Sequence, residues 1–136
     1  MKPQYFINAE MHLGLQEVRD AKILNSYLKK YAGWNYNVAT TPWCAAFVNA
    51  CLGEAGIQGT GSFMARSFLK WGQKVTQPQE GDIVVFKRGT GASGHVTFFV
   101  SDHDKDHIEV LGGNQSDKVC IKLYRKDSLL GYRRPL

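Results

Sequence analysis

The spacing of hydrophobic residues changes once along the chain, near residue 80. Before that point, apolar residues recur every three or four positions, which is the period of a helix with one buried face. After it, short apolar or β-branched runs are separated by Gly, Asp, Asn or Ser, a pattern typical of strands and turns. Helices followed by strands predict an α+β domain in which N-terminal helices pack on an antiparallel sheet of about five or six strands.

The first part of the chain predicts three helical regions. Residues 8–31 are helical by their period, either as one helix or as two with a break near Gly14, and Gly33 is a stop signal. Residues 63–71 form a short apolar run for which Ser62 can serve as the N-cap. The third region, residues 41–52, carries the most chemistry and is described below. The second part predicts strands at residues 83–86, 96–101, 108–111, 119–124 and 130–133.

The helix at residues 41–52 carries a cysteine in its opening turn. Thr41 is a typical N-cap, and Pro42 suits the first helical position because its missing N–H has no partner there. Cys44 follows directly, where free N–H groups and the positive end of the helix dipole favour a thiolate over a thiol. Most cysteines at such positions are buried apolar residues. The helix alone therefore suggests a nucleophile without establishing one.

A histidine and an asparagine are predicted to face each other across a hairpin. The charged turn at residues 102–107 separates two apolar strands. If the turn is centred between residues 104 and 105, His95 and Asn114 are equally distant from it and lie opposite each other. The turn's own acidic residues either bind calcium weakly or are solvated. The hairpin thus supplies two polar side chains at its open end.

Cysteine, histidine and asparagine together form the nucleophile, base and orienting group of a papain-like hydrolase. His95 would take the proton of the Cys44 thiol, or hold the thiolate as half of an ion pair, and later protonate a leaving amine. The side-chain carbonyl of Asn114 would accept a hydrogen bond from the other imidazole nitrogen and fix the tautomer. Each residue has an ordinary structural explanation alone, and their combination points to catalysis.

Composition narrows the remaining possibilities. With 136 residues, 43% hydrophobic and 21% charged, the chain suits one globular catalytic domain over residues 1–136, and we expect a monomer. Its net charge of +5 favours polyanionic partners, but the basic residues are scattered, so we do not expect nucleic-acid binding. No run is apolar enough to insert stably in a membrane, and the three cysteines match no common zinc spacing. We expect no metal and no cofactor.

Four ordered segments resemble those of one enzyme superfamily. They are Pro-Trp-Cys-Ala-Ala-Phe at 42–47, Gly-Asp-Ile-Val-Val-Phe at 81–86, Gly-His-Val at 94–96 and Gly-Gly-Asn-Gln-Ser at 112–116. Their order and spacing are similar to those of the CHAP and NlpC-like cysteine amidases and peptidases. The segment at 129–135 resembles the end of a compact subgroup common in phage and prophage genomes. The resemblance implies a papain-like fold and cleavage of amide bonds in peptidoglycan, without metal or cofactor.

By motif, the resemblance implies Cys44 as nucleophile and His95 as base, with Asn114 as the orienting residue. It also implies a broad substrate pocket, which we place around Tyr36, Trp43 and Ser93. The Cys44 N–H is the first candidate for stabilising an oxyanion, with the side chain of Tyr36 or Trp43 as a second donor.

The chain departs from the family pattern at two places. Gly112 stands where many CHAP members have an acidic residue, two positions before the asparagine. Residues 39–41, Ala-Thr-Thr, stand where related sequences often have an aspartate before Pro-Trp-Cys.

The resemblance implies a peptidoglycan hydrolase of the phage endolysin type. The chain's first residues lack the apolar run of a secretory signal, so we expect synthesis in the cytoplasm of a bacterial host and action at the cell wall or periplasm after release. The alternatives are an antibacterial amidase effector with the same chemistry and a catalytically silent cell-wall-binding module with the same fold.

Overall fold

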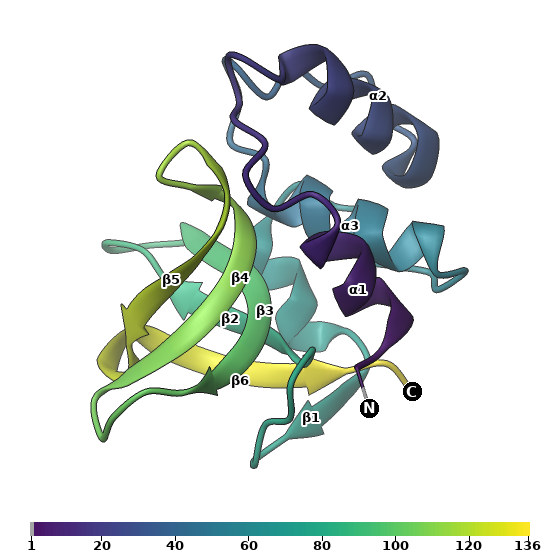
Figure 1. The fold of residues 1–136 in the computed structure, drawn as a ribbon. Helices are drawn as coiled ribbons and strands as arrows, with labels where there is room; N and C mark the ends of the chain where they lie inside the picture. The colour runs from purple at the N-terminus through teal and green to yellow at the C-terminus, as the bar shows by residue number, and fades with distance from the viewer. Residues whose placement is uncertain (1) are drawn as a thin grey trace.

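The computed structural model describes residues 2–136 as helices packed on one curved sheet (Figure 1). The helices are α1 (Gln4–Glu10), α2 (Ala21–Ala32), α3 (Cys44–Glu54) and the 3₁₀ helices η1 (Ala65–Lys70) and η2 (Lys126–Ser128). The strands are β1 (Gln73–Val75), β2 (Ile83–Lys87), β3 (Gly94–Asp102), β4 (His107–Gln115), β5 (Lys118–Arg125) and β6 (Leu129–Arg134). None of these helices has the length and apolar character needed to cross a membrane.

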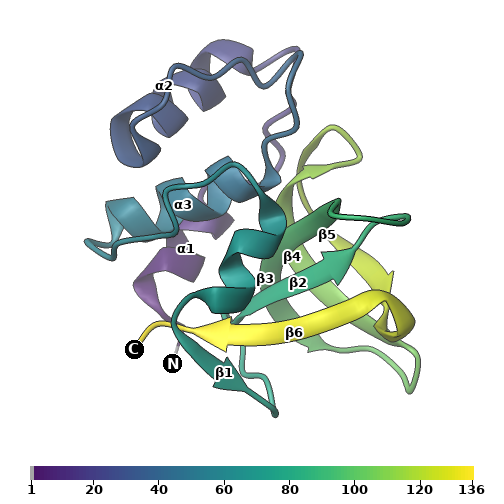
Figure 2. The ribbon, with the colours of Figure 1, turned by 180° about the vertical axis from the view of Figure 1, so that it is seen from behind.

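The six strands form one antiparallel sheet in the order β1-β6-β2-β3-β4-β5. The sheet curls strongly, and α1, α2 and α3 lie together beside it, with α3 between α2 and the strands (Figures 1 and 2). The predicted α+β fold with helices on an antiparallel sheet is therefore confirmed. It agrees with the papain-like arrangement that the resemblance implies.

The predicted elements are present with shifted ends. The region 8–31 contains parts of two helices, and the chain between them adopts a left-handed conformation at Gly14, with φ of 92°. Gly33, with φ of 84°, ends α2 as predicted. The region 63–71 contains a 3₁₀ helix instead of an α-helix, and Ser62 accepts a hydrogen bond from the Met64 N–H. The sequence did not reveal β1, a three-residue strand of mostly exposed residues at the edge of the sheet.

The helix that carries the cysteine starts later than predicted. The first residue of α3 is Cys44, and Trp43 occupies the N-cap position without capping through its side chain. Thr41 is therefore not the N-cap. Pro42 precedes the helix because its carbonyl accepts a hydrogen bond from the Tyr36 hydroxyl, which holds this stretch as part of the preceding loop.

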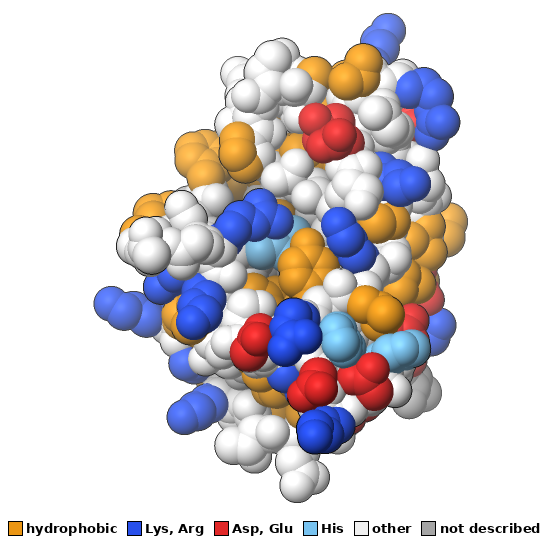
Figure 3. All heavy atoms as spheres, turned by 90° about the vertical axis from the view of Figure 1, so that its left-hand side faces the viewer, with side chains coloured by type: hydrophobic (Ala, Val, Ile, Leu, Met, Phe, Trp, Pro, Cys, Tyr) orange, Lys and Arg blue, Asp and Glu red, His pale blue; other side chains and the backbone are white. Residues whose placement is uncertain are grey.

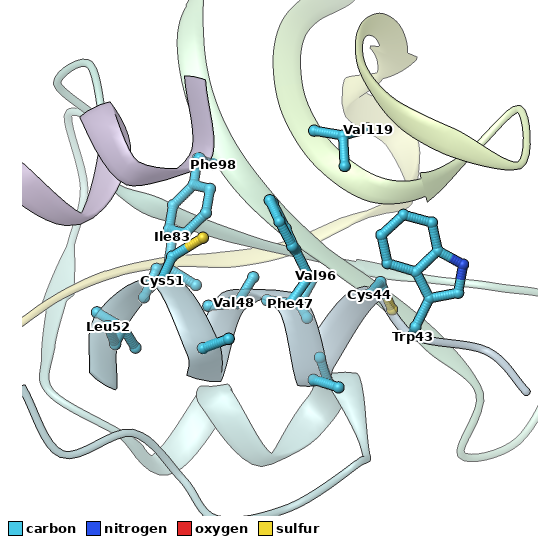
Figure 4. Packing of buried hydrophobic residues seen from close by; sticks show 14 of the residues in the cluster. Trp43, Cys44, Phe47, Val48, Cys51, Leu52, Ile83, Val96, Phe98 and Val119 are labelled. Carbon is cyan, nitrogen blue, oxygen red and sulfur yellow. The ribbon is translucent and has the colours of Figure 1, made fainter. Parts of the chain in front are cut away.

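Almost the whole of α3 is buried. Every residue from 44 to 52 is buried, since the sheet covers one face of the helix and α1 and α2 cover others. Figure 4 shows Phe47 and Cys51 along α3 with Val96 and Phe98 of β3 close by, and Cys44 at the start of the helix beside Trp43. A helix that is apolar on all sides is stable only inside a core. The position of Cys44 is therefore fixed by the packing of the whole helix.

An ion pair ties the start of β2 to the end of β6. The guanidinium of Arg134 donates two hydrogen bonds to Asp82, each 2.7 Å long, and the carboxylate also accepts one from the Gln79 N–H at 2.8 Å. The side chain of Asp82 is only 3% exposed. A buried carboxylate is tolerated when such partners satisfy it.

Asp82→Asn should lower the free energy of unfolding by about 2–3 kcal/mol, since it removes the charge and at least one of these bonds while nearly preserving the shape of the side chain. Urea unfolding measures the change. Asp127→Asn, which removes the charge from the exposed Arg125–Asp127 pair, serves as the matched control and should leave stability almost unchanged. Equal losses in the two variants would contradict the importance of the buried pair.

Candidate active site

Cys44 borders a pocket between the start of α3, the loop before η1 and the loop that joins β2 to β3. The pocket has a volume of about 450 Å³. It is lined by Pro42, Cys44, Phe63, Met64, Ala65, Arg88, Ala92, Ser93 and Gly94. Ser93, which the sequence placed in the substrate pocket, thus shares a pocket with the cysteine. Cys51 and Cys120 are free thiols that lie outside this pocket.

The environment of Cys44 works in two directions on its ionisation. Its side chain lies at the N-terminus of α3, and the N–H of Val96, the charge of Arg88 and the N–H groups of the first helical turn all lower the pKa of the thiol. Burial raises it by more, because Cys44 is only 6% exposed. The net pKa is above its ordinary value. The expected thiolate is therefore not the resting form, since desolvation outweighs the helix terminus.

His95 is held by a glutamine. The Nε2 atom of His95 lies 2.9 Å from Oε1 of Gln115. The amide orientation of Gln115 is fixed because its Nε2 donates to the carbonyl oxygens of Cys120, at 2.7 Å, and Val110. An amide oxygen can only accept a hydrogen bond, so Nε2 of His95 carries the hydrogen and donates it.

This tautomer leaves the lone pair of the imidazole on Nδ1. Within residues 2–136, Nδ1 of His95 is buried and has no hydrogen-bond partner. Val96, the next residue in β3, brings its N–H up to the sulfur of Cys44. The histidine with the free basic nitrogen is therefore the chain neighbour of the residue whose N–H faces the thiol. An unpartnered buried nitrogen is costly in a purely structural role, and it is what a general base requires.

Asn114, the predicted partner of His95, does not make this contact. The predicted register holds at Phe98, which pairs with Leu111. Beyond Leu111, β4 bulges relative to β5, and Asn114 takes a left-handed conformation with φ of 60°. The bulge changes which side chain faces the histidine. The orienting contact therefore belongs to Gln115, one residue later in the predicted motif.

Two glycines make this bulge possible. A Cβ atom on Gly112 would collide with the hydroxyl of Thr97 and lie 2.9 Å from Oε1 of Gln115. A Cβ atom on Gly113 would lie 2.5 Å from the ring of Trp43. The space above Gly112 is thus occupied by the amide of Gln115. The glutamine thus reaches the histidine through the room that Gly112 leaves.

The imidazole is also enclosed by aromatic and cationic groups. The ring of Tyr124 stacks on His95 with ring centres 5.2 Å apart and planes inclined by 8°. Burial lowers the pKa of His95 to about 4, and the positive charges of Arg88 and Lys122 act in the same direction, while the hydrogen bond that His95 donates to Gln115 raises the pKa. At neutral pH the imidazole is therefore neutral. Cys44 therefore rests as a thiol and His95 as a neutral base, and the ion-pair alternative is not favoured.

The lowered pKa predicts a loss of stability in acid. The unfolded chain protonates His95 near pH 6.5, while the folded chain does so only near pH 4. Between these values the unfolded state binds more protons, so the free energy of unfolding falls with falling pH, by about 3 kcal/mol in total from this group. Urea unfolding of the wild type and of His95→Gln, at about pH 7 and about pH 4.5, should show a larger acid-induced loss in the wild type. An NMR titration in which the His95 ring has its midpoint near pH 6.5 would contradict this prediction.

The two aromatic residues predicted to contact substrate have different positions. Tyr36 is half-buried and lines a second pocket of about 390 Å³, which shares Pro42 and Phe63 with the pocket of Cys44. Trp43 is completely buried, and its Nε1 donates a hydrogen bond to Glu17 at 2.9 Å. Trp43 therefore cannot touch substrate or serve as a second oxyanion donor in this conformation. Its indole instead fills the space against Gly113.

The N–H of Cys44 meets one requirement of an oxyanion donor. Within residues 2–136, Thr41 makes no hydrogen bond to this N–H, so the capping contact that would have occupied it is absent. The donor lies at the positive end of α3, next to the sulfur.

Charged side chains outside the site do not gather into an obvious ligand cluster. In residues 2–136 no three His, Cys, Asp or Glu side chains come close enough together to hold a metal ion. Asp104, in the turn where weak calcium binding was considered, accepts hydrogen bonds from His107 and from the Asp106 N–H. Figure 3 shows Lys and Arg side chains interspersed with uncharged and apolar ones over the face on the β5 side of the molecule.

A comparison with known protein families places Cys44 and His95 within one family model. The family model of the CHAP domain matches residues 33–114, a span that includes Cys44, His95 and both aromatic loop residues. No curated protein matches the chain.

Proposed function

The chain belongs to the CHAP domain family, whose members are generally hydrolytic cell-wall amidases and peptidases, and on this premise we propose that it hydrolyses an amide bond of peptidoglycan with Cys44 as the nucleophile. The buried, unpartnered Nδ1 of His95 is the observation that carries the proposal. Gln115 fixes the ring so that this nitrogen bears the lone pair. A silent binding module has no need for such a nitrogen.

The proposed first step is a proton transfer coupled to attack. His95 Nδ1 takes the proton of the Cys44 thiol as the sulfur forms a bond to the amide carbonyl carbon of the substrate. The carbonyl electrons move to oxygen, and the N–H of Cys44 donates a hydrogen bond to this oxyanion. The carbon–nitrogen bond then breaks, and the leaving amine takes the proton from His95. A thioester on Cys44 and a free amine result.

Hydrolysis of the thioester completes the proposed cycle. His95 takes a proton from a water molecule, whose oxygen attacks the thioester carbon. The carbon–sulfur bond breaks, and the sulfur receives the proton from His95, so a carboxylic acid leaves and the thiol is restored. Because both groups start and end neutral, burial opposes only the intermediates in which His95 is protonated. The charge on the oxyanion beside it offsets part of that cost.

The test of this function is release of new amino groups from purified peptidoglycan, with the fragments identified by mass. Free stem peptides ending in an L-alanine amine would identify an N-acetylmuramoyl-L-alanine amidase. Amino groups within shortened stem peptides would identify an endopeptidase. No release from several peptidoglycan types by folded protein would favour the silent cell-wall-binding module.

We further propose that the protein is of the endolysin type and acts at the cell wall. The similarity of its ordered motifs to those of compact phage and prophage proteins supports this assignment. Purified protein should clear suspensions of bacteria whose outer barrier has been permeabilised. Activity on isolated peptidoglycan without clearing would contradict the endolysin assignment, and an immunity protein encoded beside it would instead favour the effector.

A further inference from the structure

The cationic side chain of Arg88 lines the same pocket as Cys44, the candidate nucleophile. Arg88 is exposed and lies at the end of β2, where the chain enters a short loop closed by a hydrogen bond from the Arg88 N–H to the Ser93 carbonyl at 3.2 Å. The guanidinium of Arg66 donates to the same carbonyl at 2.9 Å. The loop contains two glycines with left-handed backbone, Gly89 and Gly91. Arg88 thus lies at the start of a turn that two hydrogen bonds to the Ser93 carbonyl hold in place.

The charge of Arg88 reaches the reacting groups and is not neutralised. Burial raises the pKa of the Cys44 thiol and of Tyr124, and the charge of Arg88 opposes that rise. Burial lowers the pKa of His95, and Arg88 adds to that fall. Among the described residues, Arg88 takes part in no ion pair, and no Asp or Glu lines the pocket. An arginine in a ligand pocket without an acidic partner is suited to bind a carboxylate of the ligand through two parallel hydrogen bonds.

Several other residues that line the pocket are apolar. They are Pro42, Phe63, Met64 and Ala65, and the rings of Phe63 and Tyr36 lie 5.4 Å apart, centre to centre. Such side chains suit a small aliphatic group such as an alanine methyl. The pocket therefore presents both apolar side chains and a cation to a ligand at Cys44.

We propose that Arg88 forms a subsite for a free carboxylate of the peptidoglycan stem peptide, so that the protein distinguishes stem peptides with free carboxylates from those in which they are amidated. This inference rests on the proposed function for the identity of the ligand. Two carboxylates of a stem peptide have the required chemistry. One is the α-carboxylate of a γ-linked D-glutamate, and the other is the C-terminal carboxylate.

The test uses equilibrium binding, which does not require cleavage. The probes are three forms of the tripeptide L-Ala-γ-D-Glu-L-Lys: one with both carboxylates amidated, one with only the glutamate α-carboxylate free, and one with only the C-terminal carboxylate free. They are titrated into Cys44→Ala, with Arg88→Gln and Lys87→Gln added singly in the same background. Lys87→Gln removes a neighbouring positive charge that lies outside the pocket.

One free-carboxylate tripeptide should bind about tenfold or more tightly than the fully amidated one, because a charge-assisted pair at an accessible site supports a difference of that size. Which tripeptide shows the preference identifies the carboxylate. Arg88→Gln should reduce the ratio of affinities towards one, and Lys87→Gln should preserve it. Equal binding of all three peptides, no measurable binding of any, or a ratio that survives Arg88→Gln would overturn the inference.

Cleavage assays separate this inference from the proposed function. Wild-type protein that binds with the carboxylate preference but releases no amine from peptidoglycan would leave the subsite intact and refute the hydrolase. Cleavage of free and amidated stem peptides at equal kcat/KM would support the hydrolase and refute the subsite. The ratio of kcat/KM values is the relevant quantity, since the effect of Arg88 on the Cys44 pKa acts on both substrates alike.

Discussion

Cys44→Ala should lower the rate of amino-group release from peptidoglycan by about 10³-fold or more, because alanine cannot form the covalent intermediate proposed on Cys44. The substitution removes one sulfur atom from a side chain that is already buried, so the fold should persist. Circular dichroism and urea unfolding verify that, and amine release measures the activity. A variant that is folded and still active at a tenth of the wild-type rate would rule out Cys44 as the nucleophile.

The other two cysteines provide controls. Cys51 lies two turns further along α3 and is completely buried, and burial raises the pKa of its thiol well above the usual value. Cys51→Ala therefore removes a similar volume from the same helix without touching the site. Cys51→Ala should retain activity once corrected for any loss of folded protein. Cys120→Ala is a less strict control, because its partly buried thiol donates a hydrogen bond to the carbonyl of Gln115.

Gln115→Leu should lower kcat by about 10²-fold or more, because the histidine loses the acceptor that fixes its tautomer and ring orientation. Asn114→Gly is the matched neighbour, since glycine tolerates the left-handed backbone at that position and the asparagine side chain makes no contact with His95. Its kcat should fall much less. The reverse order of effects would return the orienting role to Asn114.

A pH profile separates a positioning role of Gln115 from simple loss of stability. Gln115→Glu keeps an oxygen next to Nε2 of His95 but adds a negative charge, which stabilises the imidazolium and raises the pKa of His95. The acid limb of the rate profile should therefore move to higher pH than in the wild type, where the pKa of His95 is about 4. A limb that stays in place while the overall rate falls would indicate that Gln115 only supports the fold.

The fold class could be predicted from the sequence because hydrophobic residues follow one dominant spacing in each half of the chain. The helical period before residue 80 and the alternating runs after it specify which faces are buried, and the sheet that covers those faces follows. The start of α3 was missed because Thr41 and Pro42 are good helix-starting residues locally. A hydroxyl from Tyr36, five residues before Thr41, holds the Pro42 carbonyl outside the helix. Such a contact has no local signature.

Cys44 and His95 could be proposed as nucleophile and base from sequence because each lies at the start of a predicted helix or strand. The orienting residue could not be identified in this way, since its identity depends on a bulge of β4. A pairing count from the turn assumes a regular ladder, and the two glycines at 112 and 113 allow the ladder to break. The Gly-Gly-Asn-Gln segment does contain the partner of His95, but the prediction named Asn114 and the structure shows the contact at Gln115. The burial of Trp43 was equally hidden, because a tryptophan next to a catalytic cysteine suits either a core or a binding surface.

The burial of Cys44 also affects how fast its sulfur is oxidised or alkylated when no substrate is bound. Peroxides and alkylating reagents attack thiolates that they can reach, and this sulfur is both protonated and almost enclosed. Sulfenic acid formation at Cys44 should accordingly be slow, and the half-exposed Cys120 is the more accessible target. The burial that keeps the thiol protonated also keeps oxidants away from the sulfur, and it thus protects the candidate nucleophile from oxidation.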